Sequence, residues 1–192
     1  MSTVLNEQYW NLLKSLQSTP RNSIKISSKA PIINIDLDTR RIELPPELKD
    51  FLSVETDHRA ETLYFRTARY HDEVDLLNVA IAVEYINAKG ESRLYPVGVV
   101  DVTSEPGNIL FAWCLGREAS HYDGTLTFAV RFFSVDLNEH IFTYSLSTLP
   151  IGGNIAAGLG NMDKPEEYDL SADIIYELMQ TIESSKPHWV NV

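Results

Sequence analysis

The sequence predicts a mainly β protein, an antiparallel β-sandwich of about eight or nine strands with an N-terminal and a C-terminal amphipathic helix. Short runs of alternating apolar and polar residues fill the stretch from 31 to 149, with turns rich in Gly, Pro, Asn and Asp about every ten residues. Apolar residues recur at helical spacing on either side of it. We therefore expect a helical arm and linker in 1–30, the β core in 31–149, and a glycine-rich linker, helix and tail in 150–192.

The N-terminal helix is predicted over residues 3–17. Its apolar positions are Leu5, Tyr9, Leu12, Leu13 and Leu16, whose spacing places them on one face. A helix of about 15 residues is marginal alone in water, so this face has to dock, either on its own domain or on a neighbouring subunit. Residues 23–30 are interpreted as a linker or an edge strand.

The first strands come in hairpins. Residues 33–37 and 41–44 alternate around a turn-rich tripeptide, and two prolines end the second run. A loop or helical turn is expected in 46–59, and residues 61–68 form the next strand. The β-branched run 79–86 returns through 92–97 around a loop that ends in Gly90, which can adopt positive φ.

The second half of the core continues this pattern. Residues 99–102 form a short strand, and 109–115 are so apolar that we expect a strand buried on both faces or packed under the N-terminal helix. Residues 125–133 give the clearest alternation, and 141–146 are expected to return antiparallel to them.

Beyond the sheet, residues 151–160 are interpreted as a flexible, glycine-rich connector. A second amphipathic helix follows, with Asp169 or Ser171 available as its N-cap and a tail that ends in an aromatic anchor, Trp189. Its apolar positions are Leu170, Ile174, Ile175, Leu178, Met179 and Ile182.

Composition limits the partners and the compartment. The net charge of −11 argues against non-specific binding of nucleic acid or an anionic membrane, since those partners attract a positive face. A single cysteine, Cys114, cannot form an internal disulfide, and from the sequence we expect neither a signal peptide nor a membrane-spanning run. We expect a soluble protein made in a cytoplasm.

No catalytic motif emerges from the polar residues. The richest cluster, 57–59 with 71–75, offers His and carboxylate ligands for a metal, but its spacing matches no metal motif and a solvated loop is the favoured interpretation. In that interpretation Asp75 bonds its own turn backbone. Cys114 lies in an apolar strand where a thiol stays inert, and the glycines of 152–160 fit no phosphate-binding loop and are interpreted as a hinge. We expect neither a cofactor nor a metal, and no enzymatic activity.

Surface aromatics are a weaker signal. A patch for sugars or for a protein partner could form from Tyr64, Tyr70, Tyr85, Tyr95 and Trp189. On alternating strands about half of all aromatics face the core, so each one is more often packing than recognition.

Several segments together resemble a known group of proteins. They are Ile35-Asp36-Leu37 with Arg41-Ile42, Phe51-Leu52-Ser53-Val54, the run from Asp57 to Phe65, Arg69-Tyr70, Asp75-Leu76, Tyr85-Ile86-Asn87-Ala88 and Tyr95-Pro96-Val97. Their order resembles virion structural proteins of tailed bacteriophages of Gram-positive hosts, and is similar to the N-terminal β-sandwich of baseplate upper proteins, which docks fibres onto the tail. The resemblance spans roughly residues 32–147 and carries over no active-site residue. Unlike the adaptor pattern, we expect no long fibre, coiled coil or receptor-binding domain after this region.

The resemblance implies a non-enzymatic assembly or adaptor subunit of the tail or baseplate, found in the virion and bound to copies of itself and to other virion proteins. Two alternatives stay open: a capsid decoration or head-fibre base protein, and a carbohydrate-binding module. In either virion role the two helices would clasp neighbouring subunits. The expected interface residues are Leu12, Leu13, Leu16, Ile174, Ile175, Leu178, Met179 and Trp189.

Overall fold

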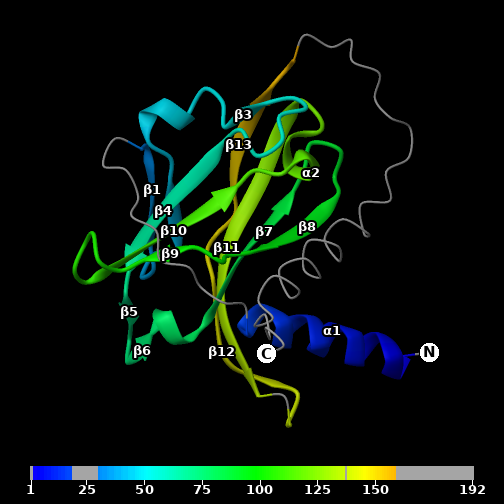
Figure 1. The fold of residues 1–192 in the computed structure, drawn as a ribbon, viewed down its shortest axis with the longest axis vertical. Coiled ribbons are helices and arrows are strands. Elements are labelled where there is room, and N and C mark those ends of the chain that lie inside the picture. Colours follow the sequence, from blue (N-terminus) through cyan, green and yellow to red (C-terminus); the bar gives the residue numbers. More distant parts are fainter. Residues whose placement is uncertain (1, 19–29, 137, 159–192) are drawn as a thin grey trace, which may run out of the picture. The chain divides into compact units, whose positions relative to one another are not determined.

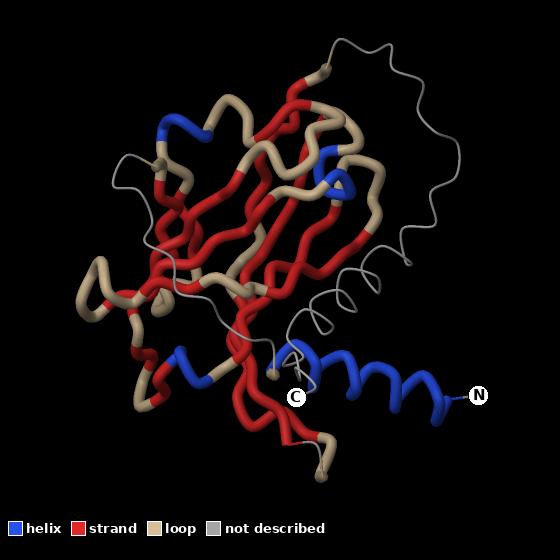
Figure 2. The backbone as a smooth tube through the Cα atoms, viewed as in Figure 1, coloured by secondary structure: helices blue, strands red, loops and turns tan. Residues whose placement is uncertain are grey.

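The computed structural model describes residues 2–18, 30–136 and 138–158, and this part of the chain is mainly β (Figures 1 and 2). The chain divides into a compact unit, Met1–Gly158, and a second unit, Leu159–Val192, which lies outside the described residues. Helices and 3-10 turns are α1 (Ser2–Gln17), η1 (Pro46–Leu48), η2 (Leu76–Asn78) and α2 (Arg117–Ser120). Strands are β1 (Ile32–Asp36), β2 (Arg41–Glu43), β3 (Ser53–Val54), β4 (Thr62–Ala68), β5 (Tyr70–His71), β6 (Val74–Asp75), β7 (Ala80–Ile86), β8 (Ser92–Pro96), β9 (Val100–Asp101), β10 (Asn108–Cys114), β11 (Gly124–Asp136), β12 (Ile141–Ser147) and β13 (Ile151–Ala156).

One sheet has five strands in the order β2-β1-β4-β10-β9. Its members are antiparallel except that β1 and β4 run parallel, with Ile33 opposite Phe65. Alternation explains β4, in which Leu63, Phe65 and Thr67 are buried and the residues between them are partly exposed. In β10 the five central residues are all buried, which confirms a strand buried on both faces.

The other large sheet is built on β11. Its order is β3-β13-β11-β7-β8, and β12 also pairs with β11. Along one edge of β11, β13 pairs with Gly124–Phe128 and β12 pairs with Arg131–Asp136. Thr148 lies where the two meet: its N–H bonds the Val130 carbonyl, and its Oγ1 accepts the Val130 N–H at 2.9 Å. The Thr148 side chain thus continues the hydrogen bonding along this edge of β11 between its two partner strands, β13 and β12.

The main core joins residues of both sheets. Phe65 of β4 stacks on Phe111 of β10 at 5.1 Å between ring centroids. From the other sheet, Phe128 of β11 meets Phe65 and Trp113 edge to face, at 6.1 and 5.5 Å. All four rings are almost fully buried, and edge-to-face and offset geometries are the favourable ones for aromatic pairs.

Helix α1 packs on the opposite face of the β11 sheet. Leu13 and Leu16 are 4% and 6% exposed and form a second apolar cluster with Ala80, Ala82, Phe133 and Val135. Trp10 stacks on His140 at 5.4 Å between ring centroids. Gln17 adds a directional contact, because its Oε1 accepts the backbone N–H of Val135 at 2.9 Å. The N-terminal segment therefore docks on the sheet of its own chain.

Three predicted hairpins are confirmed, and two of them share one turn design. The pairs β1–β2, β7–β8 and β11–β12 are all antiparallel. In the first, Asp36 Oδ1 accepts two N–H groups of the turn and Arg40 has a φ of 59°. In the last, Asp136 does the same and His140 has a φ of 53°. An acceptor at the turn start and a left-handed residue at its end are typical of tight hairpin loops.

Three expectations about the sheets are wrong. Residues 151–156 are not a connector but strand β13, which pairs with both β11 and β3. The sheets are mixed, because β1–β4 and β3–β13 run parallel. The strands exceed eight or nine because several have only two residues, too few to show alternation in the sequence.

Candidate functional site

The two polar loops that were weighed as a metal site, 57–59 and 71–75, lie apart. The His58 Nδ1 accepts the backbone N–H of Arg117 in α2 at 3.1 Å. His71 instead lies 3.2 Å from the Tyr144 hydroxyl of β12. Figure 1 shows α2 and β5 near opposite ends of the sheets. Among the residues that the structure describes, no three His, Cys, Asp or Glu side chains come together as metal ligands.

Asp75 has a structural role in its loop. Its carboxylate accepts two hydrogen bonds from the Arg69 Nε and one, at 2.6 Å, from the Arg69 Nη2. Its Oδ1 also accepts the N–H of Leu77 at 3.1 Å, which confirms that Asp75 bonds its turn backbone. The hydrogen bonds from Arg69 are the main reason that the pKa of Asp75 lies below its usual value. The charge is used to close the short β5–β6 hairpin.

Of the aromatics considered for a sugar patch, the four that the structure describes are divided between the core and the surface. Tyr85 and Tyr95 pack on Trp113, with ring centroids 5.2 and 6.3 Å away. Burial raises the pKa of both tyrosines. Tyr70 is 55% exposed and Tyr64 is half-buried, while Trp189 lies outside the described residues.

The cysteine and two of the glycines that the sequence singled out lie in strands. Cys114 is half-buried at the end of β10, opposite Thr62 of β4. Gly152 and Gly153 lie inside strand β13. A Cβ added at Gly153 would stand 2.3 Å from the Leu52 Cδ1, so this glycine makes room for a core side chain. The hinge interpretation is therefore wrong for these two glycines.

The expected interface residues divide into three groups. Leu13 and Leu16 are buried against the chain's own sheet, whereas Leu12 is 42% exposed. The C-terminal group lies outside the described residues: Ile174, Ile175, Leu178, Met179 and Trp189.

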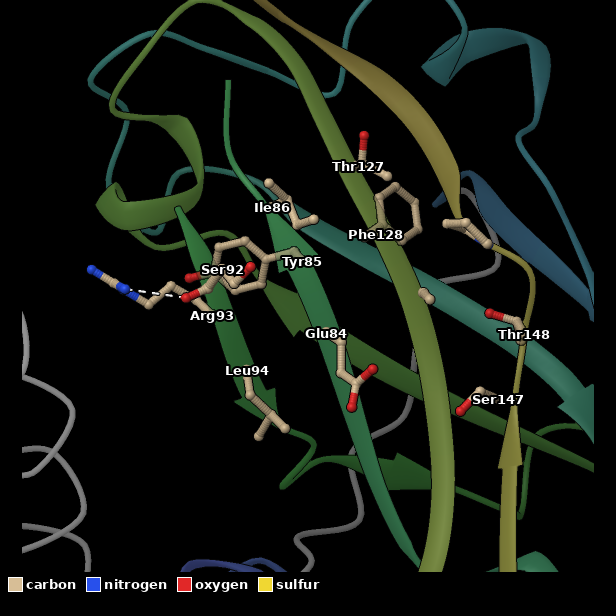
Figure 3. A pocket seen from close by; sticks show the side chains of 12 residues that line it. Glu84, Tyr85, Ile86, Ser92, Arg93, Leu94, Thr127, Phe128, Ser147 and Thr148 are labelled. Carbon is tan, nitrogen blue, oxygen red and sulfur yellow. Dashed lines mark hydrogen bonds between the residues drawn. The ribbon is translucent and has the colours of Figure 1, made fainter. Parts of the chain in front are cut away.

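A groove beside α1 is the candidate site that the sequence analysis missed. It has a volume of about 580 Å³ and lies on the face of the β11 sheet that α1 also contacts. This outer groove is lined, among others, by Glu84 and Ile86 of β7, Ser92 and Leu94 of β8, and Thr127 and Ala129 of β11. Figure 3 shows Glu84, Ile86 and Leu94 on the two neighbouring strands, with Thr127 on β11 beside them.

The strand register relates the outer groove to α1. Along the β7–β11 pair, Ala80 is opposite Phe133, and both belong to the cluster under α1. Further along, Glu84 is opposite Ala129 and Ile86 is opposite Thr127, and all four line the groove. One sheet face is thus divided lengthwise between a docked helix and the outer groove, and Leu94 contributes to both.

Two of the twelve residues that line the outer groove, Glu84 and Arg93, are charged, and the others are neutral. Glu84 carries its carboxylate 3.1 Å from the Arg131 Nη1, and the Arg131 guanidinium stands 5.0 Å over the Phe142 ring. Because this pair is partly exposed, its contribution to stability is small. Ile86 is 44% exposed, which is the main apolar exposure in the groove. Such a surface suits an apolar partner better than a charged ligand.

The sequence holds a faint signal for the groove. Outward-facing positions of β11 read Thr125, Thr127, Ala129 and Arg131 before the chain reaches Phe133 and Val135. The change from small to large residues marks the border between groove and helix-covered sheet. It is visible only once the register of β7 against β11 is known.

Comparisons with known proteins add no assignment. No protein-family model matches the chain, and no curated protein sequence matches it. In the described ranges, no helix is both long enough and apolar enough to cross a bilayer.

Proposed function

We propose that this chain is a non-enzymatic structural subunit of a tailed-bacteriophage virion, acting as an assembly or adaptor subunit of the tail or baseplate. The observation that carries the assembly role is the outer groove, an apolar surface next to a helix already docked on the same sheet face. The phage setting is supported by the resemblance described above. We also propose that the two large sheets, which share one core, form a variant of the β-sandwich.

Helix α1 shows how apolar burial stabilises a helix on this sheet face. Burial of apolar surface contributes roughly 25 cal/mol per Å², whichever chain supplies the surface. Leu13 and Leu16 show that this sheet face takes a helix by apolar contact. The outer groove continues the same face and exposes Ile86. An assembly partner would gain the same kind of stabilisation there that α1 gains beside it.

A measurement of solution mass tests the assembly role. Light scattering behind a sizing column would compare the full chain with a chain that ends at Gly160. We expect a multimer for the full chain and a monomer for the truncated one, since the proposal uses the C-terminal segment between subunits. Monomers in both cases would contradict self-assembly.

The position in the particle needs a second experiment. Purified full chain would be mixed with fibreless phage tails and, separately, with empty capsids, and bound protein would be measured after sedimentation. A tail or baseplate subunit binds the tails. Binding to capsids alone would instead support the decoration role.

A further inference from the structure

We propose that the outer groove is the seat for residues 169–182 of a second copy of this chain. The inference rests on the proposed function and deepens it, because it names both surfaces of the contact between copies. The groove supplies the receiving face and the C-terminal segment supplies the apolar insert. The groove is inferred from the strand register and its lining residues, whereas the insert is inferred from the sequence of 169–182.

The groove is shaped for a helix. It spans the neighbouring strands β8, β7, β11 and the end of β12, which at about 4.8 Å per strand gives roughly 14 Å across. A helix with its side chains is about 10 Å wide. Ala129 lies opposite Glu84 and Ser92 lies opposite Ile86, so each small side chain stands beside a larger one on the neighbouring strand. Beneath α1 the same sheet uses Ala80 and Ala82 in the same way to seat Leu13 and Leu16.

The insert is marked by its sequence pattern. At 3.6 residues per turn, the six apolar residues of 169–182 fall within about half of the helical projection. Asp169, Asp173 and Glu177 occupy the other half. An apolar arc this wide exceeds the minimum stripe of roughly 100° for a helix on a globular surface, so the segment offers ample apolar surface to bury. Its acidic half would remain in solvent.

The connection has enough length to reach another copy. The described chain leaves the sheet after β13, which ends at Ala156, and the Gly158 N–H lies 3.4 Å from the Glu55 Oε2. Residues 159–168 separate that point from the insert. Ten extended residues reach about 33 Å, which is comparable to the width of a small domain.

The test uses the full chain with a charge placed in the groove. Ala129→Glu should convert the multimer to a monomer and weaken self-association at least tenfold, measured by light scattering over a concentration series. Thr125→Glu is the matched control: it adds the same charge on the same strand and face, at an exposed position outside the groove lining. It should leave the mass unchanged. Equal urea midpoints for the two variants would show that the difference is not unfolding.

Cross-linking identifies the occupant. In a Cys114→Ser background, one chain carries Thr127→Cys and a second carries Leu178→Cys, and a short bismaleimide is added to each alone and to the mixture. We expect a two-chain product that forms efficiently only in the mixture. A multimer that persists in Ala129→Glu, with no such product, would overturn the groove assignment while leaving the proposed function intact.

Two other outcomes have distinct meanings. If the parent chain is a monomer at every concentration, self-assembly fails and the inference fails with it. A chain that carries both Thr127→Cys and Leu178→Cys is treated in the same way. If it links within one molecule while the mixture gives no two-chain product, the insert belongs to the same molecule. In that case the contact between copies is wrong, although the groove is still occupied.

Discussion

Replacing Gly153 by alanine should destabilise the sheet, because the glycine leaves space for a core side chain. A Cβ at this position would lie 2.3 Å from the Leu52 Cδ1 and 2.6 Å from its Cγ. Leu52 is 2% exposed, so its side chain can make room for the new methyl group only by shifting within the packed core. Gly153 does not have a positive φ, which removes backbone strain as a separate cause.

The expected magnitude follows from overpacking. An extra methyl group in a well-packed core typically costs about 1–3 kcal/mol of unfolding free energy. Alanine also lowers the conformational entropy of the unfolded chain, which stabilises the folded state by only about 0.4–1 kcal/mol, so the net effect of Gly153→Ala should still be destabilising. Gly152→Ala is the control, because its Cβ would meet only the Thr125 Cγ2 at 3.1 Å, on the exposed side of the strand. We expect Gly152→Ala to be close to neutral.

Urea unfolding followed by circular dichroism measures both variants. A double-mutant cycle with Leu52→Ala adds the decisive comparison. Alone, Leu52→Ala should cost about 2–5 kcal/mol by leaving a cavity, but part of that cavity accepts the new methyl group of Gly153→Ala. The two costs should therefore sum to more than the cost of the double variant. Strict additivity, or a Gly153→Ala protein as stable as the parent, would refute the close contact.

Three more predictions concern stability. Thr67→Val should stabilise the protein by about 1 kcal/mol, because the buried Thr67 Oγ1 has no hydrogen-bond partner. Thr148→Val should instead cost about 1–3 kcal/mol, because it leaves the Val130 N–H without its acceptor. If both variants shifted the urea midpoint in the same direction, these two predictions would be contradicted. Burial raises the pKa of Asp101, but hydrogen bonds from Ser104 and Thr103 outweigh burial and lower it overall. The contribution of Asp101 to the free energy of unfolding should therefore be fully present above pH 3.8, its ordinary pKa, and be lost as the pH falls below that value. In acid titrations, the unfolding free energy of Asp101→Asn should depend less on pH than that of the parent protein. Arg40→Gly should stabilise the protein by about 0.5 kcal/mol and so raise the thermal midpoint slightly, because Arg40 has a φ of 59°, which glycine adopts without strain. A lower midpoint would show that contacts of the arginine side chain outweigh the relief of backbone strain.

Local pairing was predictable from the sequence. The hairpin of β7 and β8 has its own signals, since alternation on both sides and a loop ending in Gly90 specify the turn. The strand β10 was also predictable, because its unbroken apolar run leaves no face for water. These features depend on residues that are close in the chain.

Long-range pairing was not predictable. The parallel pairs β1–β4 and β3–β13 join segments with no shared turn, so no local pattern marks them. Gly152 and Gly153 suggested flexibility, yet one of them serves the packing of Leu52, which is about a hundred residues away. The outer groove was hidden for the same reason, because it forms only when β7, β8 and β11 lie side by side.

The late position of β13 has a consequence for synthesis on the ribosome. Strand β3 is made early but pairs only with β13, with Ser53 opposite Ile155, and Gly124–Phe128 of β11 also wait for that strand. At roughly 5–20 residues per second, the hundred residues between them take about 5–20 s to translate. The edge of β11 is bare for a shorter time, because only roughly 20–30 residues separate Gly124–Phe128 from their partners in β13. An unpaired edge is the kind of surface that invites wrong pairing, so we expect the β11 edge, rather than the two-residue β3, to be the vulnerable one until β13 emerges.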